Sequence, residues 1–290
     1  MTIAEIHGKI SEVGTNLSER MEDLLTADSF GCFRYLPYDK GLIPFLDTAR
    51  SFHGHALVLP SEIVGVHYSF WPWVKLHGCT PCEPDVVVGL ETDERHLHLV
   101  FVEAKYHSGL SSEEDEGESP NDQLARELDN LDRISPVNLR WNPVLTITSC
   151  TLLFVTQDMG MPRTLIAQSL AEYQRKRNRQ GDVYWTSWRF LPAILEKQIA
   201  SEVNQEHRAV LEDMMLLLQR KWLTMFNGVE PVFCEFNESD FDFYHITSLR
   251  LNWPDLTVLK KIEYSYGLPK NKYEWPSMPT IEMNYEYGRR

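Results

Sequence analysis

The segment CEPDVVVGLETDERHLHLVFVEAK, residues 82–105, decides how this chain folds. Two β-rich runs flank the polar tetrapeptide TDER at 92–95, and this pattern predicts a β-hairpin. Apolar residues stand at successive positions in both runs, so both faces of the hairpin are expected to be covered. The hairpin is therefore predicted to lie in the centre of a sheet.

Three charged residues mark the open end of this hairpin. A turn centred on Glu94 sets Asp85 opposite Glu103, and directly paired residues share one face with Cβ atoms ~5 Å apart. Lys105 lies on that face too, because side chains alternate along a strand. The three side chains are therefore expected to converge. The alternative is a strand end that meets solvent and carries a weak surface ion pair.

Helical and strand patterns alternate along the rest of the chain. Apolar residues at helical spacing predict a helix over residues 16–27. Further helices are predicted at 122–134, 163–178 and within 190–222, and further strands at 151–158, 182–188 and, from the run HALVLP, 55–60. This alternation predicts an α/β fold in which helices cover both faces of a central sheet.

Composition and charge restrict the functions to consider. The 290 residues are 43% hydrophobic and 11% aromatic, which is typical of a folded globular protein. We predict a core domain at residues 1–222 and an aromatic-rich C-terminal extension at 223–290 that packs on it. The net charge is −14, whereas proteins that bind long nucleic acids by charge alone are usually basic. A nucleic-acid function would therefore need a local basic patch, a divalent metal or a partner protein.

The converging carboxylates predict a metal site. Two close carboxylates repel each other unless a cation lies between them, and oxygen ligands of this kind suit Mg²⁺ or Mn²⁺. A lysine beside such a site could hold or help to deprotonate a water molecule, and could offset charge on a phosphoryl transition state. Asp85, Glu103 and Lys105 therefore fit metal-assisted hydrolysis of a phosphodiester.

These residues also carry a family resemblance. Pro84-Asp85, followed after a hairpin by Glu103-Ala104-Lys105, resembles the signature of the PD-(D/E)XK nuclease superfamily, the restriction-endonuclease-like proteins. The resemblance covers roughly residues 16–190. It implies a mixed central sheet between helices, with the signature on two adjacent strands. It also implies a metal-dependent endonuclease or exonuclease, with Asp85 and Glu103 as metal ligands and Lys105 as the residue that assists the attacking water.

The resemblance points to two further site residues. Members of the superfamily often carry an acidic residue on a helix before the core, and here Glu19, Glu22 and Asp23 compete for this role. Glu22 lies nearer the edge of the apolar stripe than Glu19, so we expect Glu22 to be the catalytic residue and metal ligand. Members also often carry a glutamine on the helix after the signature, which Gln123 matches. Ordinary helix positions are the alternative for both residues.

The leading hypothesis is a Mg²⁺-dependent nuclease, expected to act on DNA, with single strands or RNA as an alternative substrate. Its expected partners are nucleic acid, a protein that supplies affinity or specificity, and a second copy of the chain in a homodimer. The runner-up is a catalytically inactive PD-(D/E)XK-like module that binds other proteins in a bacterial defence or repair complex. The strongly negative charge motivates this second hypothesis.

Two basic segments are candidates for nucleic-acid contacts. Four residues near the end of the helix at 163–178 form the densest cluster: Arg175, Lys176, Arg177 and Arg179. They could bind backbone phosphates, or they could simply complement the helix C-terminus. A looser segment in the tail interleaves Lys260, Lys261, Lys270 and Lys272 with two tyrosines.

The cysteines and the N-terminus indicate the compartment. Five cysteines, an odd and scattered set, do not resemble a disulfide framework. His77, Cys79 and Cys82 supply three potential zinc ligands but lack a second CxxC pair, so ordinary buried residues are the preferred interpretation. The chain starts without an apolar signal sequence and has no run of ~18 apolar residues. We therefore expect a reduced cytoplasmic protein without a membrane segment.

Overall fold

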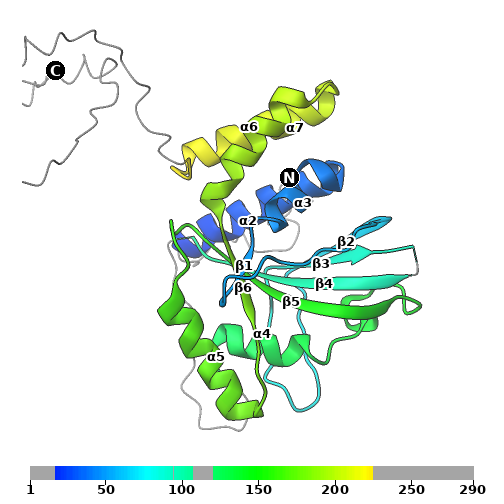
Figure 1. The fold of residues 1–290 in the computed structure, drawn as a ribbon, viewed down its shortest axis with the longest axis vertical. Coiled ribbons are helices and arrows are strands. Elements are labelled where there is room, and N and C mark those ends of the chain that lie inside the picture. Colours follow the sequence, from blue (N-terminus) through cyan, green and yellow to red (C-terminus); the bar gives the residue numbers. More distant parts are fainter. Residues whose placement is uncertain (1–16, 94, 107–119, 225–290) are drawn as a thin grey trace, which may run out of the picture. The chain divides into compact units, whose positions relative to one another are not determined.

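The computed structural model describes residues 17–93, 95–106 and 120–224 (Figure 1). The chain divides into two units, residues 1–225 and 226–290. The second unit lies outside the described residues, and so do the predicted packing of the C-terminal extension and the tail lysines. Within the part of the chain that is described, no helix is long and apolar enough to cross a membrane.

A six-stranded mixed β-sheet forms the centre of the first unit. The strand order is β1-β6-β5-β4-β3-β2, with β4–β5 and β5–β6 parallel and the other pairs antiparallel. The strands are β1 (Arg50–Ser51), β2 (Gly65–Phe70), β3 (Val86–Glu91), β4 (His96–Ala104), β5 (Thr146–Thr156) and β6 (Val183–Ser187). The predicted strands at 151–158 and 182–188 correspond to β5 and β6.

The central hairpin has the predicted register. Val87 pairs with Phe101 and Gly89 with Leu99, as a turn centred on Glu94 requires. The pairing of β3 with β4 ends at Val86 and Val102, so Asp85 follows directly opposite Glu103. All but one residue of β3 are buried, in agreement with its central place in the sheet.

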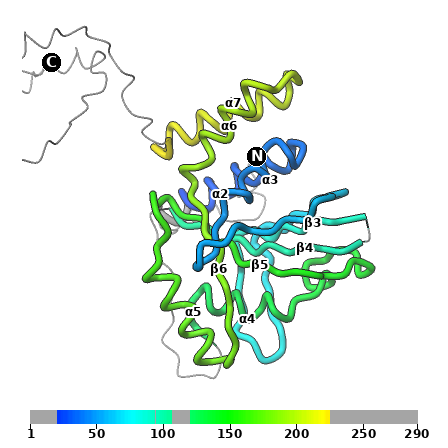
Figure 2. Tube along the Cα trace, in the orientation of Figure 1, coloured from blue at the N-terminus to red at the C-terminus, as the bar shows by residue number. Residues whose placement is uncertain are grey.

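Helices cover both faces of the sheet, so the predicted α/β class is confirmed (Figure 1). One face carries α2 (Leu17–Tyr35), α3 (Leu42–Leu46), α6 (Leu191–Ser201) and α7 (Gln205–Arg220), and the other carries α4 (Gln123–Leu131) and α5 (Arg163–Arg177). Short 3₁₀ helices stand at Tyr38–Lys40, Pro136–Leu139 and Trp188–Phe190. Figure 2 shows that α2 and α7, which lie far apart in the sequence, run close together on one face.

Hydrophobic side chains on the two faces of the sheet contribute to two separate cores. Val86 and Val88 face the core beneath α2, where Phe30 and Phe45 pack around Trp188. Val87 faces the other core, beneath α4 and α5. Because the period of a strand is two residues, consecutive valines contribute to opposite cores, which explains the unbroken apolar run in the sequence.

The expectations for residues 16–70 need correction. The helix predicted at 16–27 continues to Tyr35, and β2 was not predicted at all. The strand expected at 55–60 is wrong, since only an isolated bridge at Ala56 forms there. Val58 in this run is 84% exposed, so the apolar run HALVLP does not form a buried strand.

Gly89 in β3 permits close packing against an aromatic ring. A Cβ atom at this position would lie 2.7 Å from the Trp141 ring and 3.0 Å from a Leu97 methyl group. We expect Gly89→Ala to lower the free energy of unfolding by about 1–3 kcal/mol, because overpacking a core forces side chains off their rotamers. Urea denaturation measures this, with Gly160→Ala as the control, where an added Cβ meets nothing within 4 Å. Equal stability of both variants would contradict the prediction.

Candidate metal centre

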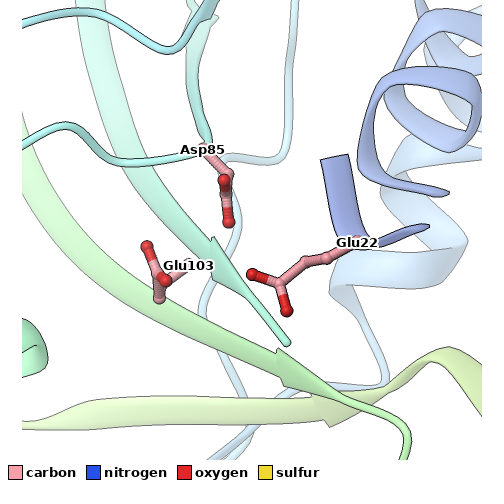
Figure 3. A group of neighbouring side chains, drawn as sticks. All are labelled: Glu22, Asp85 and Glu103. Atoms are coloured by element: carbon pink, nitrogen blue, oxygen red, sulfur yellow. The ribbon is translucent and has the colours of Figure 1, made fainter. Parts of the chain in front are cut away.

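Three buried carboxylates converge beside the open end of the β3–β4 hairpin (Figure 3). Asp85 immediately precedes β3, Glu103 is the penultimate residue of β4, and Glu22 reaches in from α2. One oxygen from each lies within 4.8 Å of the other two. No other group of this kind occurs among the described residues, which include His77, Cys79 and Cys82.

Asp85 is fixed by two N–H donors. The backbone N–H of Ala104 donates to Oδ2 at 2.8 Å, and the indole Nε1 of Trp71 donates to Oδ1 at 3.1 Å. Trp71 has a φ of 45°, and its backbone N–H donates to the Asp85 carbonyl at 2.9 Å. Burial, and then the charge of Glu103, nevertheless hold the pKa of Asp85 well above its usual range.

Glu103 is the most deeply buried member of the cluster. Its Oε1 accepts hydrogen bonds from Gln123 Nε2 and Lys105 Nζ, both at 2.6 Å. Its Oε2 is buried and has no hydrogen-bond partner among the described residues. Burial, and next the negative charge of Glu127, raise the pKa of Glu103 well above its usual range. A cation within the cluster would stabilise the ionised form of this carboxylate.

Lys105 links two of the three carboxylates. Its Nζ lies 2.6 Å from Glu103 Oε1 and 3.0 Å from Glu22 Oε1. Burial by itself would lower the pKa of Lys105, but Glu103, Asp85 and Glu22 together raise it above its usual range. Lys105 is therefore an ammonium at neutral pH. When all three carboxylates are ionised, one ammonium leaves a net charge of −2, which one divalent cation would balance.

The structure thus brings together all five residues that the sequence suggested for the centre, namely Asp85, Glu103, Lys105, Glu22 and Gln123. Gln123 is the first residue of α4, whose N-terminus is capped by the Asp122 side chain. The cap fixes where the helix begins and therefore fixes the backbone position of Gln123.

Two neighbours of the centre were missed in the sequence. Glu127 lies one helical turn after Gln123, and burial raises its pKa to about 7. The four-residue spacing from Gln123 could have identified it, because such residues share one helix face. No sequence pattern pointed to Trp71, because its contact with Asp85 depends on β2, a strand that was not predicted.

The basic cluster on α5 is used largely within the fold. Arg177 donates to both carboxylate oxygens of Asp129 and to the carbonyl of Gly78. Arg179 pairs with Asp132 at 3.3 Å. These two side chains tie α5 to α4 and to the loop at Gly78. Arg175 remains exposed at the helix surface.

Fold and site together define an α/β protein with a carboxylate–lysine cluster at the end of its central hairpin. The cluster offers oxygen ligands of the type that Mg²⁺ prefers, with an ammonium beside them. Comparison with known proteins finds no family model, no curated protein and no solved structure that matches the chain.

Proposed function

We propose that this protein is a Mg²⁺-dependent nuclease that hydrolyses phosphodiester bonds, with DNA as its substrate. The observation that carries the proposal is the convergence of Glu22, Asp85 and Glu103 around Lys105. The resemblance of these residues to the PD-(D/E)XK signature supports it. We infer that the protein acts in the cytoplasm, in keeping with the free cysteines among the described residues.

The donor set fits Mg²⁺ or Mn²⁺. Glu22, Asp85 and Glu103 would hold the ion, because one carboxylate oxygen of each lies within 4.8 Å of the other two. Bound there, the ion would supply Lewis-acid activation of water and of the phosphoryl group.

The protein's own residues would orient the reacting groups. Lys105 would donate hydrogen bonds to a water molecule or phosphate oxygen and offset negative charge. Gln123 orients the Glu103 carboxylate, and Trp71 and the Ala104 N–H orient Asp85. Preorganised partners of metal ligands typically affect metal affinity or activity by about 10–100-fold.

The test is cleavage of duplex, single-stranded and branched DNA and of RNA, with Mg²⁺ or with EDTA. We expect cleavage with Mg²⁺, none with EDTA, and none by Asp85→Ala. Thermal unfolding supplies a second readout: Mg²⁺ should raise the melting temperature of the wild type, because a cation binds the folded state. Asp85→Ala should lose this increase. Cleavage that is unchanged in EDTA or in Asp85→Ala would refute the proposal.

The net charge of −14 favours a second candidate, a catalytically inactive module that binds another protein. A stable complex with a partner, together with no cleavage of any substrate and no effect of Mg²⁺ on melting, would favour this candidate. The two proposals therefore differ in the outcome of one set of measurements.

A further inference from the structure

A cavity of about 560 Å³ lies beside the metal centre, between α2 and the C-terminal end of α7. Its lining includes Tyr106, Asp28 of α2, and the consecutive residues Arg220, Lys221 and Trp222. Cavities of ≈ 300–1,000 Å³ are typical of small-ligand sites. The volume is therefore sufficient for part of a substrate.

Tyr106 connects this cavity directly to the carboxylate cluster. It follows Lys105 in the chain, and its backbone N–H donates to Glu22 Oε2 at 2.9 Å. On the other side, its hydroxyl donates to the Lys221 carbonyl at 2.9 Å, and Lys221 Nζ lies 5.1 Å from its ring centroid. The cavity wall at Tyr106 is therefore adjacent in the chain to Lys105, the proposed catalytic ammonium.

Trp222 presents an aromatic face at this cavity. The residue is 84% exposed, although tryptophan usually buries most of its surface. Its backbone is held in the left-handed region, with a φ of 57°, and its N–H donates to the Gln219 carbonyl at 3.0 Å. Arg189 Nη1 donates to its carbonyl at 2.9 Å. The backbone is therefore fixed while the indole remains accessible.

The lining is positively charged in a protein of net charge −14. Arg220 and Lys221 are opposed by one carboxylate, Asp28, which leaves a net charge of +1. Lys221 Nζ also donates to the Met21 carbonyl at 3.3 Å, which fixes the ammonium near α2. Arg220 is exposed and Arg189 adds a further cation near Trp222. The charge of the cavity complements phosphate.

We propose that this cavity binds a single-stranded segment of nucleic acid next to the metal centre. One base stacks on the Trp222 indole, and Arg220 and Lys221 contact the adjoining phosphate. Tyr106 lines the cavity and donates its backbone N–H to Glu22, so the bound segment lies next to the carboxylate cluster. Bases in a duplex are stacked on each other, so an exposed indole favours an unpaired base. The proposal rests on the proposed nuclease function and names its substrate class.

Binding to the full chain in EDTA tests the cavity separately from catalysis. The probe is a 5′-fluorescein-labelled dT 12-mer, followed by fluorescence anisotropy, beside a blunt duplex of the same length. We expect Trp222→Ala to weaken binding of the single strand about tenfold, because stacking on an aromatic ring contributes substantially per base. Trp222→Phe should stay within about threefold of the wild type, since phenylalanine keeps a ring.

Salt dependence tests the phosphate contact. Arg220→Ala should reduce the slope of log K against log salt by about 0.7, the value for one phosphate of a single strand. Matched controls are Trp73→Ala, at a tryptophan that is 64% exposed elsewhere, and Arg208→Ala, at an exposed arginine of the same helix. Neither control should change the affinity or the slope.

Three results would overturn the inference: equal effects of Trp222→Ala and Trp73→Ala, equal losses in Trp222→Phe and Trp222→Ala, or a duplex bound as tightly as the single strand. A cleavage assay with Mg²⁺ distinguishes failure of the cavity proposal from failure of the nuclease proposal. A wild type that cleaves, with no effect of Trp222→Ala on binding, refutes the cavity and leaves the nuclease. Trp222-dependent binding without any cleavage refutes the nuclease and leaves the strand site.

Discussion

Glu103→Gln is expected to reduce Mg²⁺-dependent cleavage by about a thousandfold or more. The substitution keeps the size of the side chain, but replaces one carboxylate oxygen with an amide nitrogen, which does not bind a cation. It also removes the negative charge that holds Lys105 Nζ at 2.6 Å. Loss of a group that stabilises charge in a transition state commonly costs about 10²–10³ in rate, and loss of a metal ligand adds to this.

Single-turnover cleavage with saturating enzyme measures the effect, and melting temperature verifies that the variant is folded. The matched control is Glu196→Gln, which makes the same chemical change at an exposed position of α6. It should cleave like the wild type. Wild-type cleavage by a folded Glu103→Gln would show that the carboxylate is dispensable and would remove Glu103 from the proposed metal centre.

Without metal, the protein is expected to lose stability as the pH rises from about 5 to 8. Burial raises the pKa of Glu127 to about 7, above the ordinary 4.5 that applies to the unfolded chain. Between these values the folded state binds more protons than the unfolded state, so the free energy of unfolding falls with increasing pH. The loss from this carboxyl is on the order of 3 kcal/mol, since each pKa unit corresponds to about 1.4 kcal/mol. The raised pKa values of Asp85 and Glu103 act in the same direction.

Urea denaturation in EDTA at several pH values measures this dependence. Glu127→Gln should flatten the profile and be more stable than the wild type at pH 8, because an amide in this buried place does not ionise. The control Glu62→Gln, at an exposed position, should follow the wild-type profile. A wild type of constant stability between pH 5 and 8, or a Glu127→Gln variant that parallels it, would contradict the prediction.

The central hairpin was predictable because its information is local. The tetrapeptide TDER and two apolar runs set the register, and the register alone places Asp85 opposite Glu103. Gln123 was named from the family resemblance alone, and the structure shows that the Asp122 cap fixes the start of its helix.

Contacts between residues far apart in the sequence determine the remaining features of the site. β2 pairs with β3 at the edge of the sheet, and only this pairing brings Trp71 to Asp85. The cavity next to the cluster depends on a contact between Tyr106 and Lys221, 115 residues apart. Exposure of Trp222 likewise follows from where α7 ends against α2.

Local patterns in the sequence encode the β3–β4 hairpin, its register and the carboxylates that it aligns, because hairpin pairing acts within a few residues. Packing between distant elements selects the partners that surround those carboxylates. It buried Glu103 to 1% exposure, set Lys105 between Glu103 and Glu22, and left one oxygen of Glu103 without a partner among the described residues. Burial and pKa arise from the packing of elements distant in sequence, and no local pattern encodes them.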